Sequence, residues 1–274
     1  MIRTLATTGK YASLVVASIA TLLPLVLILF GSFKTGQEFL ATNPFTPPES
    51  WANVTNYTTA FTRGGMLRGF GNTVLIFGAA ITGTVLIGAA TAYALDRFRF
   101  PGRRAVLGLF LLATLVPGVT TQVATFQIIT GLGLYNSRWA LVLLFTGTDI
   151  ISVYVFLQFV RAVPRSLDEA AMIEGAGPLR IFFQIILPNL KPAIATVVII
   201  KGIGIYNEFF LPFLYLPDPD LRPVSTSLFA FKGPFGSQWE VISAGVVITI
   251  VPMLVLFLLL QRYVYNGFTS GATR

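Results

Sequence analysis

The sequence predicts an all-α integral membrane protein with six transmembrane helices. Three observations lead to this prediction. Of the 274 residues, 54% are hydrophobic and 11% are charged, with a mean hydropathy of +0.77, whereas about 25% of residues are charged in soluble domains. Apolar runs of about twenty residues, long enough to cross a ~30 Å hydrocarbon core, recur along the chain. Polar or basic turns separate these runs. Such a chain cannot bury its apolar surface in a water-soluble core.

The apolar runs are bounded by recognisable signals. The first follows a basic start, as in a signal peptide, but it is too long for one and lacks a small-x-small cleavage site, so we expect it to be retained. The second is rich in Gly and Ala, which lets transmembrane helices pack closely. In the third, Pro117 and Gly118 predict a kink or an unwound point. The expected spans, within a single domain over residues 1–274, are residues 11–30, 72–95, 105–130, 139–160, 192–216 and 241–260.

The distribution of basic residues predicts the orientation. With the N-terminus inside, twelve Lys and Arg residues fall on the cytoplasmic side and six on the other. Cytoplasmic loops of membrane proteins carry an excess of Lys and Arg. The net charge of +8 is therefore explained without nucleic-acid binding. We expect both termini, the segment 161–191 and the tail 261–274 to be cytoplasmic.

The segment 161–191 carries its own helix signals. Ser166, with Glu169 three residues later, forms the pattern of a capping box at a helix start. The glycines of residues 175–177 break that helix, and Pro178 is suited to the first turn of a second helix. Pro188 is expected to limit the second helix. The segment therefore predicts a short helix, a glycine turn and a second helix between two spans.

The same segment resembles the EAA loop of ABC-importer permeases. Glu169-Ala170-Ala171 is followed by Gly175 six residues after the Glu, Ile185 ten after the Gly, and then Leu187-Pro188. The resemblance implies a type I importer (MetI-like) fold, with the first helix docked in a groove of an ATPase subunit. Two alanines would allow close approach of that partner. Without a partner, the segment would simply link two spans, and Glu169 would only cap a helix. The coupling residues implied are Glu169, Ala170, Ala171, Gly175, Ala176, Gly177, Leu187 and Pro188.

The tail carries a second resemblance. Residues 266–272 are similar to the "GLTxGA" ending of the smaller maltose-importer permease and its relatives, with Phe268 in place of Leu. In that subfamily the tail reaches the ATPase dimer. Composition alone would favour a disordered terminus. The residues expected to contact the ATPase are Thr269, Ser270, Gly271 and Ala272.

Charged and aromatic residues inside the spans are candidates for the translocation path, because a charge in a membrane is costly and generally faces a cavity or a partner. Asp149 is expected to pair with Lys201, with a substrate contact as the alternative. The segment 206–210 combines rings with amide and carboxylate groups, which suits a sugar, although membrane-interface aromatics give the same pattern. It also resembles a "WNEF" segment of carbohydrate-importer permeases. Thr120, Thr121 and Gln122 are weaker candidates. The path residues predicted are Asp149, Lys201, Tyr206, Asn207, Glu208 and Phe209.

Residue types limit the possible functions. The chain has no His and no Cys, which excludes the usual zinc sites and Ser-His-Asp triads, so a membrane enzyme is the least favoured class. It has no Walker phosphate loop, so it is not itself an ATPase. We expect no metal and no cofactor on this chain.

Together, the two motifs resemble MalG-like permeases of carbohydrate-uptake ABC importers in the bacterial inner membrane. The partners implied are a second homologous permease, two ATPase subunits that use ATP and Mg, and an extracellular or periplasmic sugar-binding protein. The alternatives are an importer of another solute, such as a glycerol phosphate or an amino acid, and a secondary transporter or channel, which would need no ATPase.

Overall fold

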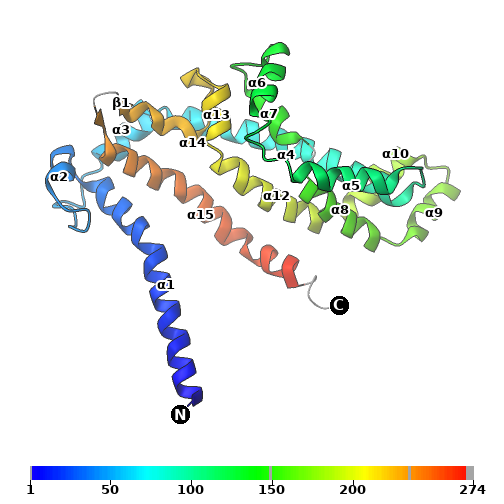
Figure 1. Ribbon diagram of the computed structural model, residues 1–274, viewed down its shortest axis with the longest axis horizontal. Coiled ribbons are helices and arrows are strands. Elements are labelled where there is room, and N and C mark those ends of the chain that lie inside the picture. The colour runs from blue at the N-terminus through cyan, green and yellow to red at the C-terminus, as the bar shows by residue number, and fades with distance from the viewer. Residues whose placement is uncertain (1, 148–149, 234–235, 270–274) are drawn as a thin grey trace. The chain divides into compact units, whose positions relative to one another are not determined.

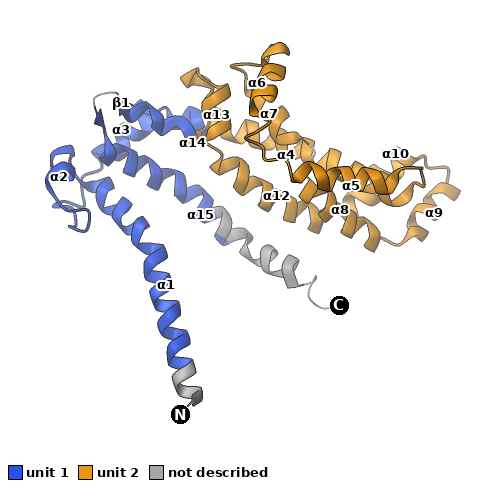
Figure 2. Cartoon of the chain, viewed as in Figure 1, with its two compact units in different colours: residues 1–70, 226–258 blue, residues 71–225, 259–274 orange. Residues whose placement is uncertain are grey.

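The computed structural model describes residues 2–147, 150–233 and 236–269, and these are almost entirely helical (Figure 1). The chain divides into two compact units (Figure 2). Unit 1 contains residues 1–70 and 226–258, and unit 2 contains residues 71–225 and 259–274. We describe each unit by itself.

Unit 1 contains two long helices and the short elements between them. A two-stranded antiparallel hairpin pairs Lys232 with Ser237. The elements are α1 (Ile2–Phe33), α2 (Gly36–Ala41), α3 (Thr55–Arg63), the first residues of α4 (Met66–Arg97), α14 (Val224–Ser227), η3 (Leu228–Phe231), β1 (Lys232–Gly233), β2 (Gly236–Ser237) and most of α15 (Trp239–Thr269).

The segment after α1 is held by buried polar contacts. Lys34 is only 2% exposed, and its Nζ donates to Thr42 Oγ1 at 2.8 Å and to the Asn43 carbonyl at 3.1 Å. The amide of Asn56 donates to the carbonyls of Ser32 and Lys34. Buried polar groups are tolerated when they are bonded in this way. The segment predicted to be a polar loop is thus held in a defined conformation by buried hydrogen bonds.

Unit 2 contains the remainder of α4 and the elements that follow it. They are α5 (Arg103–Thr114), α6 (Gln122–Gly131), α7 (Arg138–Thr146), α8 (Ile150–Ala162), α9 (Arg165–Ile173), α10 (Pro178–Ile181), the π-helical turn η1 (Phe182–Ile186), α11 (Leu187–Asn189), α12 (Lys191–Asn207), α13 (Phe210–Tyr215) and the 3₁₀ turn η2 (Pro219–Leu221).

The main core of unit 2 is formed by α4, α8, α12 and the segment between α8 and α12. Small residues let α4 approach its neighbours. A Cβ atom on Gly83 would lie 2.5 Å from Thr146 Cγ2, and one on Gly88 would lie 3.1 Å from Phe156 Cδ2. At these two positions, glycines of the predicted second span therefore serve close helix packing, whereas a Cβ atom on Gly78 would meet no atom within 4 Å.

Breaks divide several of the predicted spans. Within the described residues, 7–33 and 66–97 are unbroken helices long and apolar enough to cross a membrane. Two bent pairs also qualify if each is one span, residues 138–146 with 150–162 and residues 178–189 with 191–207. The predicted third span is interrupted between Thr114 and Gln122, around Pro117, as predicted. The total of six spans stays a prediction.

Candidate functional site

The start of α9 differs from the prediction. The helix begins at Arg165, with Pro164 as the N-cap, and no side chain caps it. Ser166 therefore lies inside the first turn, where its backbone is already helical and its hydroxyl is not in position to cap. The capping box predicted from Ser166 and Glu169 is wrong because the fixed φ of Pro164 lets the helix start before Ser166.

The end of α9 matches the predicted glycine turn. Gly175 has φ of +82°. Its N–H donates to the Met172 carbonyl at 3.0 Å, and the N–H of Ala176 donates to the Ala171 carbonyl at 2.9 Å. This pair of bonds is a Schellman motif, in which a residue with positive φ satisfies the last free carbonyls of a helix. Gly177 is extended and leads into Pro178 in the first turn of α10, as predicted.

The second helix of the segment is continuous from Pro178 to Asn189 but changes its winding. In η1, the N–H of Leu187 bonds to the carbonyl of Phe182, five residues earlier. The helix ends at Asn189, one residue beyond Pro188, and α12 continues at an angle of 73°. Leu187 packs partly buried against the core, whereas Pro188 is exposed.

Opposite faces of α9 have different surroundings. Asp168 and Ala171 face inward, at 5% and 8% exposure. Glu169 and Ala170 are exposed, and Ile173 is 88% exposed. Of the two alanines expected to admit a partner, only Ala170 is open to one. Ala171 belongs to the core of unit 2. One face of α9 thus packs against the rest of this chain, and the opposite face is available to another protein.

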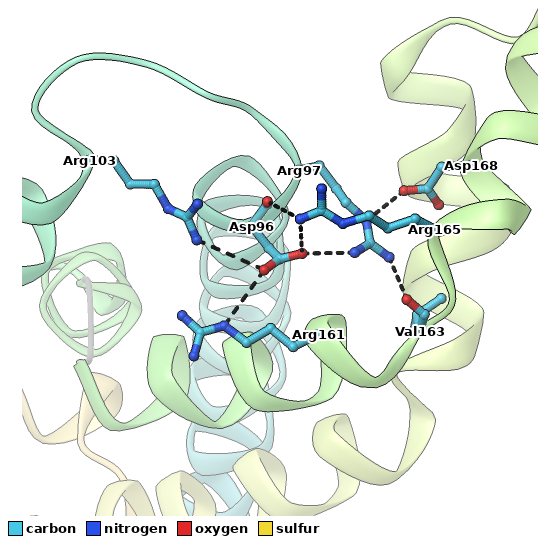
Figure 3. A network of polar contacts seen from close by, with 7 residues as sticks. All are labelled: Asp96, Arg97, Arg103, Arg161, Val163, Arg165 and Asp168. Carbon is cyan, nitrogen blue, oxygen red and sulfur yellow. Dashed lines mark hydrogen bonds and ion pairs between the residues drawn. The ribbon is translucent and has the colours of Figure 1, made fainter.

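A buried ion-pair network joins α9 to the end of α4 (Figure 3). Arg97 Nε donates to Asp168 Oδ2 at 2.6 Å, Nη1 donates to Asp96 Oδ2 at 2.8 Å, and Nη2 donates to the Val163 carbonyl at 2.8 Å. The side chains of Arg97, Asp96 and Asp168 are 7–8% exposed. Buried charges are tolerated only when they are paired and hydrogen-bonded.

Three further arginines lie around Asp96. Its carboxylate oxygens lie 3.6 Å from Arg161 Nε, 3.5 Å from Arg165 Nη2 and 3.9 Å from Arg103 Nη2. Arg165 also donates to the Asp96 backbone carbonyl at 3.1 Å. These side chains come from α5, α8 and α9 (Figure 3). This network was not predicted from the sequence. The one local signal for it is the Asp-Arg pair at the end of a predicted span.

Of the predicted translocation residues, 206–209 lie at the junction of α12 and α13, and Lys201 lies within α12. Lys201 and Tyr206 are half-buried, and Asn207 and Phe209 are exposed. Phe209 stacks on Phe213 with ring centroids 5.6 Å apart. Asp149 lies outside the described residues, so its pairing with Lys201 stays a prediction. Within the described ranges, no group of three or more Asp, Glu, His or Cys side chains could hold a metal ion.

Two of the other candidates make structural contacts. Gln122 Nε2 donates to the hydroxyl of buried Tyr215 at 2.9 Å. Glu208 Oε1 accepts the backbone N–H groups of Phe210 and Leu211 at 2.9 and 3.1 Å. Glu208 therefore stabilises the start of α13, where the helix dipole also favours a negative charge.

Replacing Glu208 by Ala is expected to destabilise the chain by about 1 kcal/mol, since a lost helix-capping acceptor costs roughly 0.5–2 kcal/mol. Glu208→Gln retains an acceptor oxygen and should lose less. Thermal unfolding of the purified protein in detergent measures both effects, with Asn207→Ala at the exposed neighbouring position as the control. An unchanged unfolding temperature for Glu208→Ala, together with lost transport, would contradict the capping role.

The tail is only partly described. Thr269 is the last residue of α15. Ser270, Gly271 and Ala272 lie outside the described residues, so the expected contact of the tail with an ATPase stays a prediction.

The apolar helices and the exposed face of α9 define the class of protein, a membrane protein with a helix available to a partner. The chain belongs to the family of binding-protein-dependent transport system inner membrane components, which matches residues 84–269. It has the MetI-like fold of ABC-importer permeases. The resemblance seen in the sequence is thus confirmed at the level of the family.

Several relatives of this chain are permeases named for carbohydrate uptake. It is 32% identical over 268 residues to the diacetylchitobiose uptake system permease protein NgcG of Streptomyces coelicolor, covering 97% of this chain and 88% of the relative. It is 30% identical over 267 residues to the galactooligosaccharides transport system permease protein GanQ of Bacillus subtilis, covering 97% and 94%. The sulfoquinovosyl glycerol transport system permease protein SmoH of Agrobacterium fabrum is 31% identical over 270 residues, covering 97% and 94%.

A solved structure shares the fold. A chain in the crystal structure of a bacterial ABC transporter that imports the acidic polysaccharide alginate matches with a TM-score of 0.81. The match covers 95% of this chain and 96% of that chain, at 19% sequence identity. A likeness at this identity concerns the fold alone.

Proposed function

We propose that this chain is the permease subunit of an ATP-driven importer of mono- or oligosaccharides. It forms half of the translocation path and receives the movement of the ATPase through residues 161–191. The observation that carries the proposal is α9, which presents Glu169, Ala170 and Ile173 outward in a chain of the permease family. Gly175 ends the helix sharply, so that a short and well-defined element is offered to the partner.

The mechanism is mechanical. Closure of the ATPase subunits moves α9 as a rigid body, and the spans switch between inward and outward access. Ala171 of α9 and Ile181 of α10 pack into the same core as α4, α8 and α12. Because a close-packed core transmits displacement instead of absorbing it, a push on α9 reaches the membrane helices.

A sugar is the substrate class that the relatives' names favour. The curated relatives described above are named for diacetylchitobiose, galactooligosaccharides and sulfoquinovosyl glycerol. In this chain, Phe209 stacks on Phe213, and Asn207, two residues before Phe209 in the sequence, is exposed. Rings can stack on the C–H faces of a sugar while amides bond its hydroxyl groups. A glycerol phosphate or an amino acid is the alternative cargo.

The partners follow from this function. They are a second homologous permease, two ATPase subunits that bind ATP and Mg, and a sugar-binding protein outside the cytoplasm. The chain itself binds no cofactor. It lies in the bacterial inner membrane with both termini in the cytoplasm, an orientation supported by the excess of basic residues on that side.

Affinity purification from the native membrane in mild detergent tests the proposal. Mass spectrometry is expected to find a second permease and an ATPase with a Walker motif. A co-purified binding protein would then be assayed for sugar binding. Recovery of this chain alone, active for solute flux in liposomes, would overturn the proposal in favour of a secondary transporter.

A further inference from the structure

We propose that Arg97 is the positioning residue that makes α9 and α4 move together. Its buried ion pair with Asp168 is the joint through which movement of α9 reaches the membrane helix. This inference rests on the proposed function of α9 as the ATPase-coupling helix, and it names a residue outside residues 161–191 on which that coupling depends.

The Arg97 guanidinium joins three parts of the chain. Its three nitrogens donate in three directions, to Asp168 on α9, to the Val163 carbonyl between α8 and α9, and to Asp96 on α4. One side chain thus links the end of α4 to both sides of the start of α9 (Figure 3). Only the rigid fork of Arg presents several N–H donors at fixed angles, and the ammonium group of Lys does not.

The pair between Arg97 and Asp168 is buried. Arg97 and Asp168 are 8% and 7% exposed at the side chain, so water does not compete for the bond between them. Breaking a buried pair by removing one partner leaves an uncompensated charge, which is strongly unfavourable. A displacement that pulled α9 away from α4 would have to expose both charges. Movement of α4 and α9 as one body is therefore favoured over their separation.

The groups around the pair hold Arg97 in place. Asp96 holds the Nη1 side of the guanidinium and also lies near Arg161 and Arg165, which fixes the orientation of Arg97. Asp168 Oδ1, in contrast, is buried and has no hydrogen-bond partner among the described residues. Arg97 thus contacts α9 through one hydrogen bond, at Oδ2, and Arg165 of α9 adds a second link by donating to the Asp96 carbonyl. Because the Arg165 side chain is 55% exposed, water competes for that second link, and the buried Arg97 pair is the stronger of the two.

The test measures relative movement of α9 and α4 in the assembled complex. Because the chain has no Cys, spin labels on Ile87→Cys in α4 and Leu167→Cys in α9 report one distance. Both positions are exposed, and Leu167 lies outside the set of residues proposed to face the ATPase. The distance between the two labels is measured by pulsed electron paramagnetic resonance, with and without Mg-ATP and vanadate. The variants are Arg97→Ala, Arg97→Lys and Asp168→Asn. Arg99→Ala, an exposed arginine two residues away, is the matched control.

We expect the wild type and Arg99→Ala to keep one narrow distance in both nucleotide states. Arg97→Ala and Asp168→Asn should retain the ATPase but give a broadened distance that changes with nucleotide. Arg97→Lys should give an intermediate result, because it keeps the charge and loses the fork. An Arg97→Ala complex that behaves as the wild type would overturn the inference. If the complex with Arg97→Ala fails to assemble, the same distance measurement is made with Asp168→Asn, which keeps the side-chain shape. Wild-type behaviour of that variant would overturn the inference.

The assay separates this inference from the proposed function. A wild-type complex without an ATPase would refute the coupling function itself. A wild-type complex with its ATPase, and variants whose two helices still move together, would refute only the role of Arg97.

Discussion

Replacing Glu169 by lysine is expected to reduce uptake to the background while leaving the protein folded and inserted. Glu169 is exposed on the side of α9 that faces away from the core, whereas Asp168 and Ala171 face inward. A surface substitution of this kind usually changes the free energy of unfolding by no more than about 0.5 kcal/mol. At an interface, however, a reversed charge removes the electrostatic complementarity between the two surfaces, and association is lost.

Uptake by cells that express the complete importer, and co-purification of the ATPase, measure the effect of Glu169→Lys. Glu174→Lys is the matched control, because it reverses an exposed charge of the same segment beyond the end of α9. Normal uptake by Glu169→Lys would show that the assignment of the coupling site is wrong. Loss of membrane insertion would show instead that the residue is structural.

Replacing Gly175 by leucine is the second change with a large expected effect. At φ of +82°, a residue with a Cβ atom costs roughly 1–2 kcal/mol more than Gly. A Cβ atom there would meet no atom within 4 Å, so the cost comes from the backbone alone. The chain should relieve the strain by opening the Schellman motif, which disturbs the end of α9 and its fit to the ATPase.

A graded series tests this explanation. Gly175→Asn should impair uptake least, since Asn tolerates the left-handed conformation, and Gly175→Ala and Gly175→Leu should impair it more. Gly177→Ala is the control. Gly177 has φ of −76° and open space around it, so uptake should be unchanged. Equal impairment by Gly177→Ala would mean that the whole turn, and not the positive φ at one residue, limits uptake.

Much of unit 2 could be predicted because its signals are local. The break around Pro117, the turn at Gly175 and the helix start at Pro178 depend on the conformations available to one or two residues. The family could be recognised because the EAA pattern fixes several residue types at fixed spacing. The start of α9 was missed because the capping pattern at Ser166 competed with Pro164, which set the boundary earlier.

The Arg97–Asp168 joint could not be predicted for a different reason. Its two residues are 71 positions apart, and only the packing of α4 against the segment that follows α8 brings them together. In the sequence, Arg97 was one of several basic residues in a cytoplasmic turn, and Asp168 was the residue before a motif. The one local difference is that Asp96 precedes Arg97, and this pair does not reveal that Arg97 is buried while Arg99 is exposed.

The interruption between α5 and α6 has a consequence for the surroundings of this subunit. The turn between the two helices bonds part of its own backbone. The N–H groups of Val116, Thr120 and Gln122 donate to the carbonyls of Ala113, Pro117 and Val119. Hydrocarbon offers no hydrogen bonds to the backbone groups that a helix end leaves free. Wherever this segment lies at membrane depth, we therefore expect water or another protein to shield its backbone from lipid.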